Sequence, residues 1–283
     1  MNIIETMNLS FRYGGSATYS LKDVTLSIKR GEFVGIVGSS GSGKSTFCLT
    51  LNGIIPHSIH GEFSGDVWVD GMNTKEHSVA ELSKVVGLVF QNPDSQLFNM
   101  TVLEEVAFAL ENLGVEREEM WRRIKWALKL VGLWEKREEF PPNLSGGEKQ
   151  RLAIASVLVM KPKVLVLDEP TSQLDPVGKE SVLGLVKLLN KEEKITVLLV
   201  EHNTEFLLEN ADRIVVFDKG RVVMEGKPEE VFEEVERLEE VGVRIPARVK
   251  LGYELKRRGL ADRAVLSSEE IVKILRIAGN VRT

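Results

Sequence analysis

A short apolar run that leads into a glycine-rich loop constrains the fold of this chain more than any other feature. Residues 33–37 predict a buried strand, and residues 38–46 read Gly-Ser-Ser-Gly-Ser-Gly-Lys-Ser-Thr. In such a P-loop, glycines let backbone N–H groups converge on phosphate, and the helix that follows presents the positive end of its dipole. Lys44 is then expected to contact the β- and γ-phosphates, and the Ser45 hydroxyl to bind Mg²⁺. The pattern predicts an α/β fold with a nucleotide-phosphate site between a strand and a helix.

Two carboxylates follow another apolar run. Residues 164–167 are four consecutive aliphatic residues, and Asp168 and Glu169 come directly after them. Because ligand sites collect at the carboxyl ends of strands in α/β sheets, both carboxylates are expected near the phosphates. Asp168 would bind Mg²⁺ directly or through water, and Glu169 would polarise the attacking water.

A third segment, residues 144–151, reads Leu-Ser-Gly-Gly-Glu-Lys-Gln-Arg and opens a predicted helix that runs to about residue 160. With the P-loop and the carboxylate pair, it resembles the signature of the ATP-binding cassette (ABC) ATPases over about residues 1–230. The resemblance implies that Ser145, Gly146, Gly147 and the helix N-terminus face a γ-phosphate bound by the opposite subunit of a dimer. Glu148 stands where the family more often has glutamine.

Three single residues extend the resemblance. Gln91 matches the Q-loop glutamine, which senses Mg²⁺ and couples to a membrane partner. His202 matches the switch histidine at the γ-phosphate, with Glu201 before it where Ser or Thr is usual. Tyr13 matches the aromatic residue that stacks on adenine.

The resemblance and the motifs together give a full set of expected site residues. Those expected to act in hydrolysis are Lys44, Gln91, Glu169 and His202. Those expected to bind Mg²⁺ are Ser45, Gln91 and Asp168. Those expected to bind ATP are Tyr13, Gly38, Ser39, Ser40, Gly41, Ser42, Gly43, Lys44, Ser45, Thr46, Ser145, Gly146 and Gly147.

One segment narrows the resemblance within the ABC group. Residues 91–98 read Gln-Asn-Pro-Asp-Ser-Gln-Leu-Phe, which is similar to the ATPases of energy-coupling-factor (ECF) transporters, importers of vitamins or transition-metal ions. This similarity implies an ATPase subunit that binds ATP and Mg²⁺. Its expected partners are a second cassette, identical or paralogous, and integral membrane transport subunits.

The alternative is a soluble ABC ATPase that acts on DNA or ribosomes. SMC-type proteins insert a long coiled coil between P-loop and Walker B, but Lys44 and Asp168 are 124 positions apart without sustained heptads. Translation-type ABC proteins carry two cassettes in one chain, whereas this chain carries one. A P-loop kinase, a third class, would not explain residues 144–151.

Composition and charge bear on location and partners. The net charge of −5 gives no general basic surface, so no nucleic acid is expected. The single cysteine, Cys48, excludes an internal disulfide and fits a reducing compartment. No apolar run approaches the ~18 residues of a membrane span, and the N-terminus lacks the pattern of a secretory signal. We therefore expect a peripheral protein on the cytoplasmic face of the cell membrane, held there by its partners.

Changes of pattern along the chain suggest two domains. Residues 1–225 are expected to form an ABC ATPase domain with an N-terminal antiparallel β region and an inserted helical subdomain at about 92–162. Residues 226–283 are expected to form a small helical appendage, with Pro228 and Pro246 each placed to begin a helix. Its apolar helical faces around Leu251, Leu255, Ile271 and Leu275 would pack on the cassette or on a second appendage.

Overall fold

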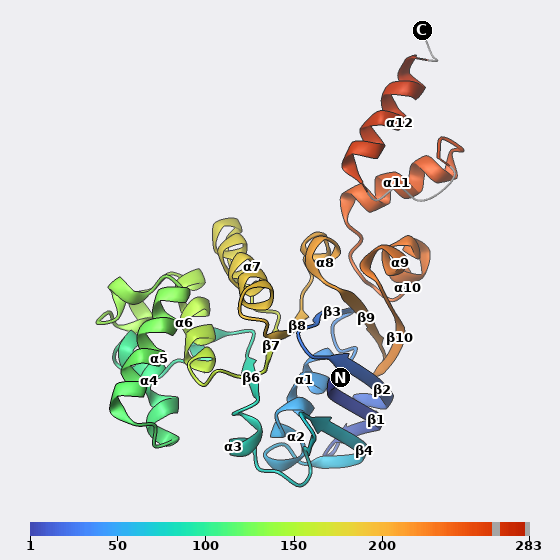
Figure 1. The fold of residues 1–283 in the computed structure, drawn as a ribbon. Helices are drawn as coiled ribbons and strands as arrows, with labels where there is room; N and C mark the ends of the chain where they lie inside the picture. The colour runs from blue at the N-terminus through green and yellow to red at the C-terminus, as the bar shows by residue number, and fades with distance from the viewer. Residues whose placement is uncertain (262–266, 281–283) are drawn as a thin grey trace.

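The computed structural model describes residues 1–261 and 267–280, and a six-stranded sheet forms its centre (Figure 1). The strand order is β10-β9-β3-β8-β7-β6, parallel from β9 to β6, with β10 antiparallel at one edge. The strands are β3 (Phe33–Gly38), β6 (Val86–Val89), β7 (Val164–Asp168), β8 (Thr196–Val200), β9 (Arg213–Asp218) and β10 (Arg221–Gly226). The parallel strands are continuous apolar runs because both faces of the sheet are covered. The predicted α/β fold class is confirmed.

A second, antiparallel sheet has the order β2-β1-β4-β5. Its strands are β1 (Asn2–Tyr13), β2 (Leu21–Lys29), β4 (Gly61–Val69) and β5 (Met72–Asn73). Alternate residues of β2, including Val24, Leu26 and Ile28, are buried, as the period of two predicts. They share a core with Phe47 and Leu51 of α1 (Lys44–Leu51), so this helix lies between the two sheets.

The helices cover the rest of the central sheet and connect its strands. Between β6 and β7 lies a block of helices, green in Figure 1, that stands to one side of the sheet. Its helices are α4 (Val102–Asn112), α5 (Arg117–Leu130) and α6 (Gly146–Leu158). The remaining helices before β10 are α2 (Ile54–His57), α3 (Val79–Leu82), α7 (Pro176–Lys191) and α8 (Thr204–Asn210). Buried residues of α4–α8 pack against the second face of the central sheet, and together they form one core.

The chain after β10 divides into two parts. Its helices are α9 (Pro228–Glu233), α10 (Val235–Glu240), α11 (Ala247–Arg257) and α12 (Ser268–Asn280). Phe232, Leu238 and Val249 are fully buried in the core that contains α7 and α8, so α9, α10 and the start of α11 pack on the cassette. Leu255 and Ile271 form a separate small cluster between α11 and α12.

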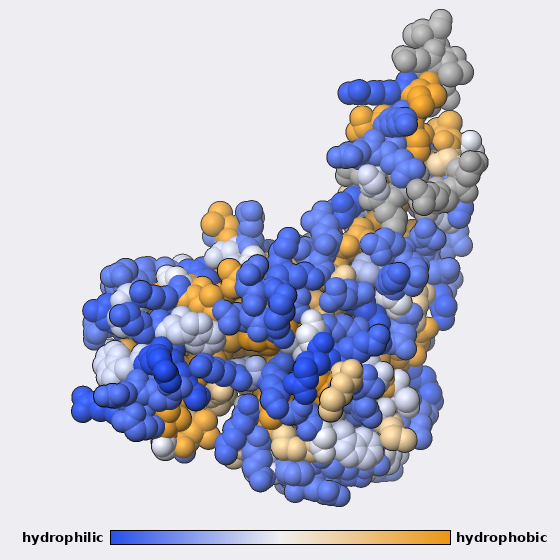
Figure 2. Space-filling view, in the orientation of Figure 1, coloured by the Kyte–Doolittle hydropathy of each residue, from blue (hydrophilic) through white to orange (hydrophobic). Residues whose placement is uncertain are grey.

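The α11–α12 pair projects from the cassette (Figure 1) and carries exposed apolar side chains (Figure 2). Leu275 is 44% exposed and Ile277 is 58% exposed. Within residues 1–261 and 267–280, no helix combines the length and the apolar character needed to cross a bilayer.

Candidate nucleotide-binding and hydrolysis site

The P-loop, residues 38–46, leaves β3 at Gly38 and continues into the first turn of α1. Gly38 has φ +149°, and a Cβ built there would lie 2.2 Å from the carbonyl oxygen of Phe217 in β9. Gly43 has φ +107°, and its Cβ would lie 2.5 Å from the carbonyl oxygen of Ser20. Both positions therefore require glycine, because the loop runs directly against neighbouring backbone.

Lys44 extends across the opening of the P-loop. Its Nζ donates hydrogen bonds to the carbonyl oxygens of Gly38 at 2.9 Å and Ser39 at 2.8 Å. Burial lowers the pKa of Lys44, and the nearby charges of Glu169 and Asp168 oppose that shift. The ammonium is therefore held beside the loop where a phosphate would bind.

Among the described residues, the buried Ser42 hydroxyl has no hydrogen-bond partner. A buried polar group without a partner is costly, and a phosphate oxygen would supply the missing hydrogen bond. Ser40, Gly41 and Ser45 are exposed in the same loop. The loop thus has the donors and the open face that a polyphosphate requires.

Asp168 ends β7 beside the P-loop helix. Burial raises the pKa of Asp168, and a hydrogen bond from Ser45 opposes that shift. Its Oδ1 is buried without a hydrogen-bond partner in the described part of the chain. An unpaired carboxylate oxygen next to a serine hydroxyl fits a Mg²⁺ ion, which binds one or two protein oxygens together with phosphates and water. The described residues hold no cluster of three or more His, Cys, Asp or Glu for a metal.

Glu169 joins Gln91 and His202 into one hydrogen-bonded group. Gln91 Nε2 donates to Glu169 Oε2 at 3.1 Å, and His202 Nε2 lies 3.0 Å from Glu169 Oε1. The three residues follow β6, β7 and β8, which are neighbours in the sheet. Because these strands are parallel, the three residues meet at the carboxyl ends of the strands, as expected of residues that act together.

The backbone of Glu169 is held in an unusual conformation. Its φ is +49°, in the left-handed region that non-glycine residues seldom adopt. The Glu169 N–H donates to the carbonyl oxygen of Val200 at 3.0 Å, which ties the residue to the end of β8. Strain of this kind, about 1–3 kcal/mol, is retained where neighbouring contacts determine the conformation, often at functional sites.

Glu201 is a further residue of the site, and no motif in the sequence predicted a role for it. It is 5% exposed, and its Oε2 accepts a hydrogen bond from the Thr171 hydroxyl at 2.6 Å. Its Oε1 accepts from the backbone N–H groups of His202 at 2.8 Å and Asn203 at 3.1 Å. Glu201 thereby connects the loop after β7 to the loop that carries the histidine. Its position before the histidine was a signal, but the partner Thr171 is 30 positions away.

We expect Glu201→Gln to lower both ATP turnover and stability. The glutamine oxygen can accept from the His202 and Asn203 N–H groups and its NH₂ can donate to the Thr171 hydroxyl, so three hydrogen bonds to a charged group become neutral ones, about half as strong. Thermal unfolding and steady-state phosphate release measure the two effects. Unchanged melting temperature and turnover would show that Glu201 does not position His202.

The signature segment forms a separate surface. Ser145 caps the N-terminus of α6, and Gly147 lies so close to α7 that a Cβ on it would be 3.0 Å from the Cα of Gly178. A pocket of about 490 Å³ lies between the two helices, and the residues that line it include Ser145, Gly146, Gly147 and Asp175. Of the described residues that line it, none belongs to the P-loop. This separation is what a site completed by a second subunit requires.

Tyr13 lies beside the helix that leaves the P-loop. Its hydroxyl is 3.1 Å from the Thr46 hydroxyl, and its ring meets the edge of Phe11 with centroids 4.9 Å apart. The Thr46 side chain is thus engaged within the protein. Stacking of Tyr13 on adenine stays a prediction.

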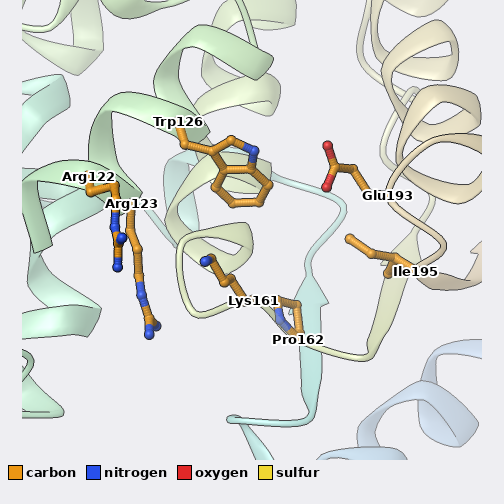
Figure 3. Close-up of a pocket in the computed structure, with 7 residues that line it drawn as sticks. All are labelled: Arg122, Arg123, Trp126, Lys161, Pro162, Glu193 and Ile195. Atoms are coloured by element: carbon orange, nitrogen blue, oxygen red, sulfur yellow. The ribbon is translucent and has the colours of Figure 1, made fainter. Parts of the chain in front are cut away.

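A further pocket, of about 560 Å³, lies away from this group (Figure 3). Lys161 and Pro162 precede β7, and Glu193 and Ile195 precede β8, while Trp126 comes from α5. The pocket therefore borders the amino ends of the strands, whereas Asp168 and its neighbours stand at the carboxyl ends. It is not part of the hydrolysis site.

Comparisons with known proteins agree with this geometry. The ABC transporter family matches residues 21–172. A putative ABC transporter ATP-binding protein of Pyrococcus abyssi is 82% identical over 272 residues, covering 96% of this chain and 97% of the relative. An energy-coupling factor transporter ATP-binding protein of Caldanaerobacter subterraneus is 44% identical over 279 residues, covering 96% of this chain and 98% of the relative.

Two solved structures show the same architecture. CbiO1 of Clostridium perfringens, described as part of the ABC transporter complex CbiONQ, matches with a TM-score of 0.74 and 36% identity, covering 87% of this chain and 96% of that one. The dimeric cassette MJ0796, in a post-hydrolysis state with ADP and Pi, matches with a TM-score of 0.68 and 33% identity, covering 80% of this chain and 98% of that one. The chain belongs to the ABC transporter family and is an ATP-binding ATPase.

Proposed function

We propose that this chain is the ATP-hydrolysing subunit of a membrane importer of the ECF type, which takes up vitamins or transition-metal ions. The observation that carries the proposal is the hydrogen bond from Gln91 to Glu169. This bond connects the hydrolysis site to the segment that begins at Gln91, and that segment leads directly to an exposed apolar surface. The relatives named as energy-coupling factor ATPases, and the place of CbiO1 in a transporter complex, support the ECF type.

The exposed surface lies on the helical subdomain. Phe98 is 65% exposed, Met100 is 69% exposed, and Phe108 of α4 meets the ring of Phe98 edge-on at 4.8 Å. The buried Glu105 carboxylate accepts hydrogen bonds from the backbone N–H groups of Phe98 at 2.9 Å and Asn99 at 2.8 Å, which holds this loop on α4. An ordered aromatic cluster facing solvent is typical of an interaction site, and we assign it to a membrane subunit.

Hydrolysis would use two cassettes with two nucleotides between them. Lys44 and the P-loop backbone bind the phosphates of one ATP, and Ser145 of the opposite subunit faces its γ-phosphate. Ser45, Asp168 and the amide oxygen of Gln91 would hold Mg²⁺, which neutralises phosphate charge when bound. Glu169 orients water and takes up its proton, while His202 keeps the carboxylate in place beside the γ-phosphate.

Purification from detergent-solubilised membranes tests the proposed function. A tagged chain is expected to retain integral membrane proteins, and the reconstituted complex is expected to import a vitamin or a transition-metal ion only with ATP. Retention of DNA or ribosomes without membrane proteins would favour the soluble ABC ATPase instead. Association with membrane proteins that drive ATP-dependent export would contradict the importer assignment.

We also propose that the projecting α11–α12 pair joins two cassettes in the absence of nucleotide. A chain that ends at Gly259 keeps Val249 and the helices packed on the cassette, so we expect it to remain folded and to bind ATP. It loses the exposed apolar residues of α12, so it should dimerise less without nucleotide. Sedimentation measures the dimer fraction.

A point substitution provides the matched control for the truncation. Leu275→Gln, at a residue 44% exposed on α12, should weaken the nucleotide-free dimer, and Leu113→Gln, at a residue 37% exposed after α4, should not. A nucleotide-free dimer unchanged by the truncation would contradict this role.

A further inference from the structure

The Glu148 carboxylate of the signature is fully engaged by two neighbours. Its Oε2 accepts hydrogen bonds from the backbone N–H and the hydroxyl of Ser145, each at 2.9 Å, and its Oε1 accepts from Lys136 Nζ at 2.6 Å. Lys136 and Ser145 lower the pKa of Glu148 to about 2. Glu148 is therefore ionised at neutral pH, next to the serine that would face the partner's nucleotide.

A charged carboxylate at this position opposes the proposed role of the signature. The N-terminus of α6 attracts an anion through its free N–H groups and its dipole. Glu148 places a negative charge in that same first turn and accepts the hydroxyl hydrogen of Ser145. Without compensation, this charge would repel a γ-phosphate brought against Ser145.

Lys136 is the cation placed to compensate this charge. Lys149, on the same helix, lies 2.9 Å from Asp94 Oδ1, and Arg151 donates to the Val131 carbonyl oxygen and the Ser181 hydroxyl, so both have other partners. Lys136 ends the turn Trp134–Lys136, and two cations lie over the Trp134 ring, Lys125 of α5 at 5.6 Å and Arg137 at 4.8 Å from its centroid. The turn is thereby fixed to the helical subdomain, and the lysine is held over Glu148.

We propose that Lys136 is a positioning residue for the signature, which neutralises Glu148 and so allows Ser145 and the α6 N-terminus to receive the phosphate of a second subunit. This inference rests on the proposed composite ATP site. Lys136 touches neither nucleotide nor Mg²⁺; it acts through Glu148. In a cassette with glutamine at position 148 the lysine would have no charge to compensate, so its contribution depends on the glutamate.

A double-mutant cycle in the Glu169→Gln background tests this dependence, because that background is expected to retain an ATP-bound dimer. The measurement is the ATP concentration that gives half-maximal dimer by light scattering. Lys136→Met should raise this concentration at least about tenfold, since like charges would then meet at the interface. The same change made together with Glu148→Gln should have no effect beyond that of Glu148→Gln alone.

Salt and a surface lysine provide the controls. The effect of Lys136→Met should shrink as ionic strength rises, because screening weakens charge repulsion but not lost packing. Lys75→Met, which breaks a surface pair with Asp66 on the antiparallel sheet, should leave the ATP requirement unchanged.

Two results would overturn the inference. If Lys136→Met has no effect, or has the same effect with glutamine at 148, the lysine does not act through Glu148. If the Glu169→Gln protein itself fails to dimerise with ATP, the composite site is wrong and the role of Lys136 falls with it. The first result leaves the composite site intact, so the two failures are distinguishable.

Discussion

Glu169→Gln is expected to lower ATP turnover by about 10²- to 10⁴-fold while ATP binding persists. The amide cannot take up a proton from the attacking water, and the change leaves the P-loop and Lys44 untouched. Gln91 and His202 both bond to the Glu169 carboxylate, so the substitution removes the group on which the catalytic cluster converges. Steady-state phosphate release measures the loss.

The same variant should form a stable dimer with ATP, because binding no longer leads to hydrolysis. Size-exclusion chromatography with ATP should show a larger species than without it. Glu193→Gln is the matched control. Glu193 lines the pocket of Figure 3, at the amino ends of the strands, so this variant should hydrolyse ATP at the normal rate. Wild-type turnover in Glu169→Gln would remove Glu169 from the mechanism.

Lys44→Ala is expected to weaken ATP binding by about 10- to 100-fold, as the loss of a charged hydrogen-bond donor implies. The buried ammonium that now bonds to Gly38 and Ser39 would be missing from the β- and γ-phosphates. Calorimetric titration with ATP at protein concentrations that keep the chain monomeric gives the dissociation constant.

Ser145→Ala provides the contrast to Lys44→Ala. Ser145 lines a pocket without a described P-loop residue, so its loss should spare ATP binding to a monomer and weaken only the ATP-dependent dimer. An equal loss of monomer affinity in both variants would contradict a site shared between subunits.

Local pattern was sufficient for the elements and the motifs. The apolar run at 33–37 became β3, the aliphatic run at 164–167 became β7, and Pro228 is the first residue of α9. In each case the signal is contained in a few adjacent residues. The mixed α/β fold followed from strands that alternate with helices.

Contacts between residues that are distant in the sequence determined the features that the local pattern did not predict. Glu201 reads as an ordinary surface residue until Thr171 and the loop of His202 are brought to it. Phe232 of α9 and Leu275 of α12 lie on helices with similar apolar spacing, yet one is fully buried in the cassette and the other is half-exposed. Burial therefore depends on which surfaces meet and not on periodicity.

The contact between Gly147 and Gly178 connects the signature helix α6 to α7, the helix that follows the loop after Glu169 in the same chain. Asp175 caps α7 by accepting a hydrogen bond from the Gly178 N–H at 2.7 Å, and only residues 170–175 separate Glu169 from that helix. In the proposed dimer, this connection would let a shift of Glu169 during hydrolysis at one nucleotide reach the face that borders the other. Such linkage is a coupling free energy and is reciprocal: each nucleotide changes the affinity for its counterpart by the same factor. A dimer with one disabled site would therefore report the cooperativity between the two ATP molecules directly.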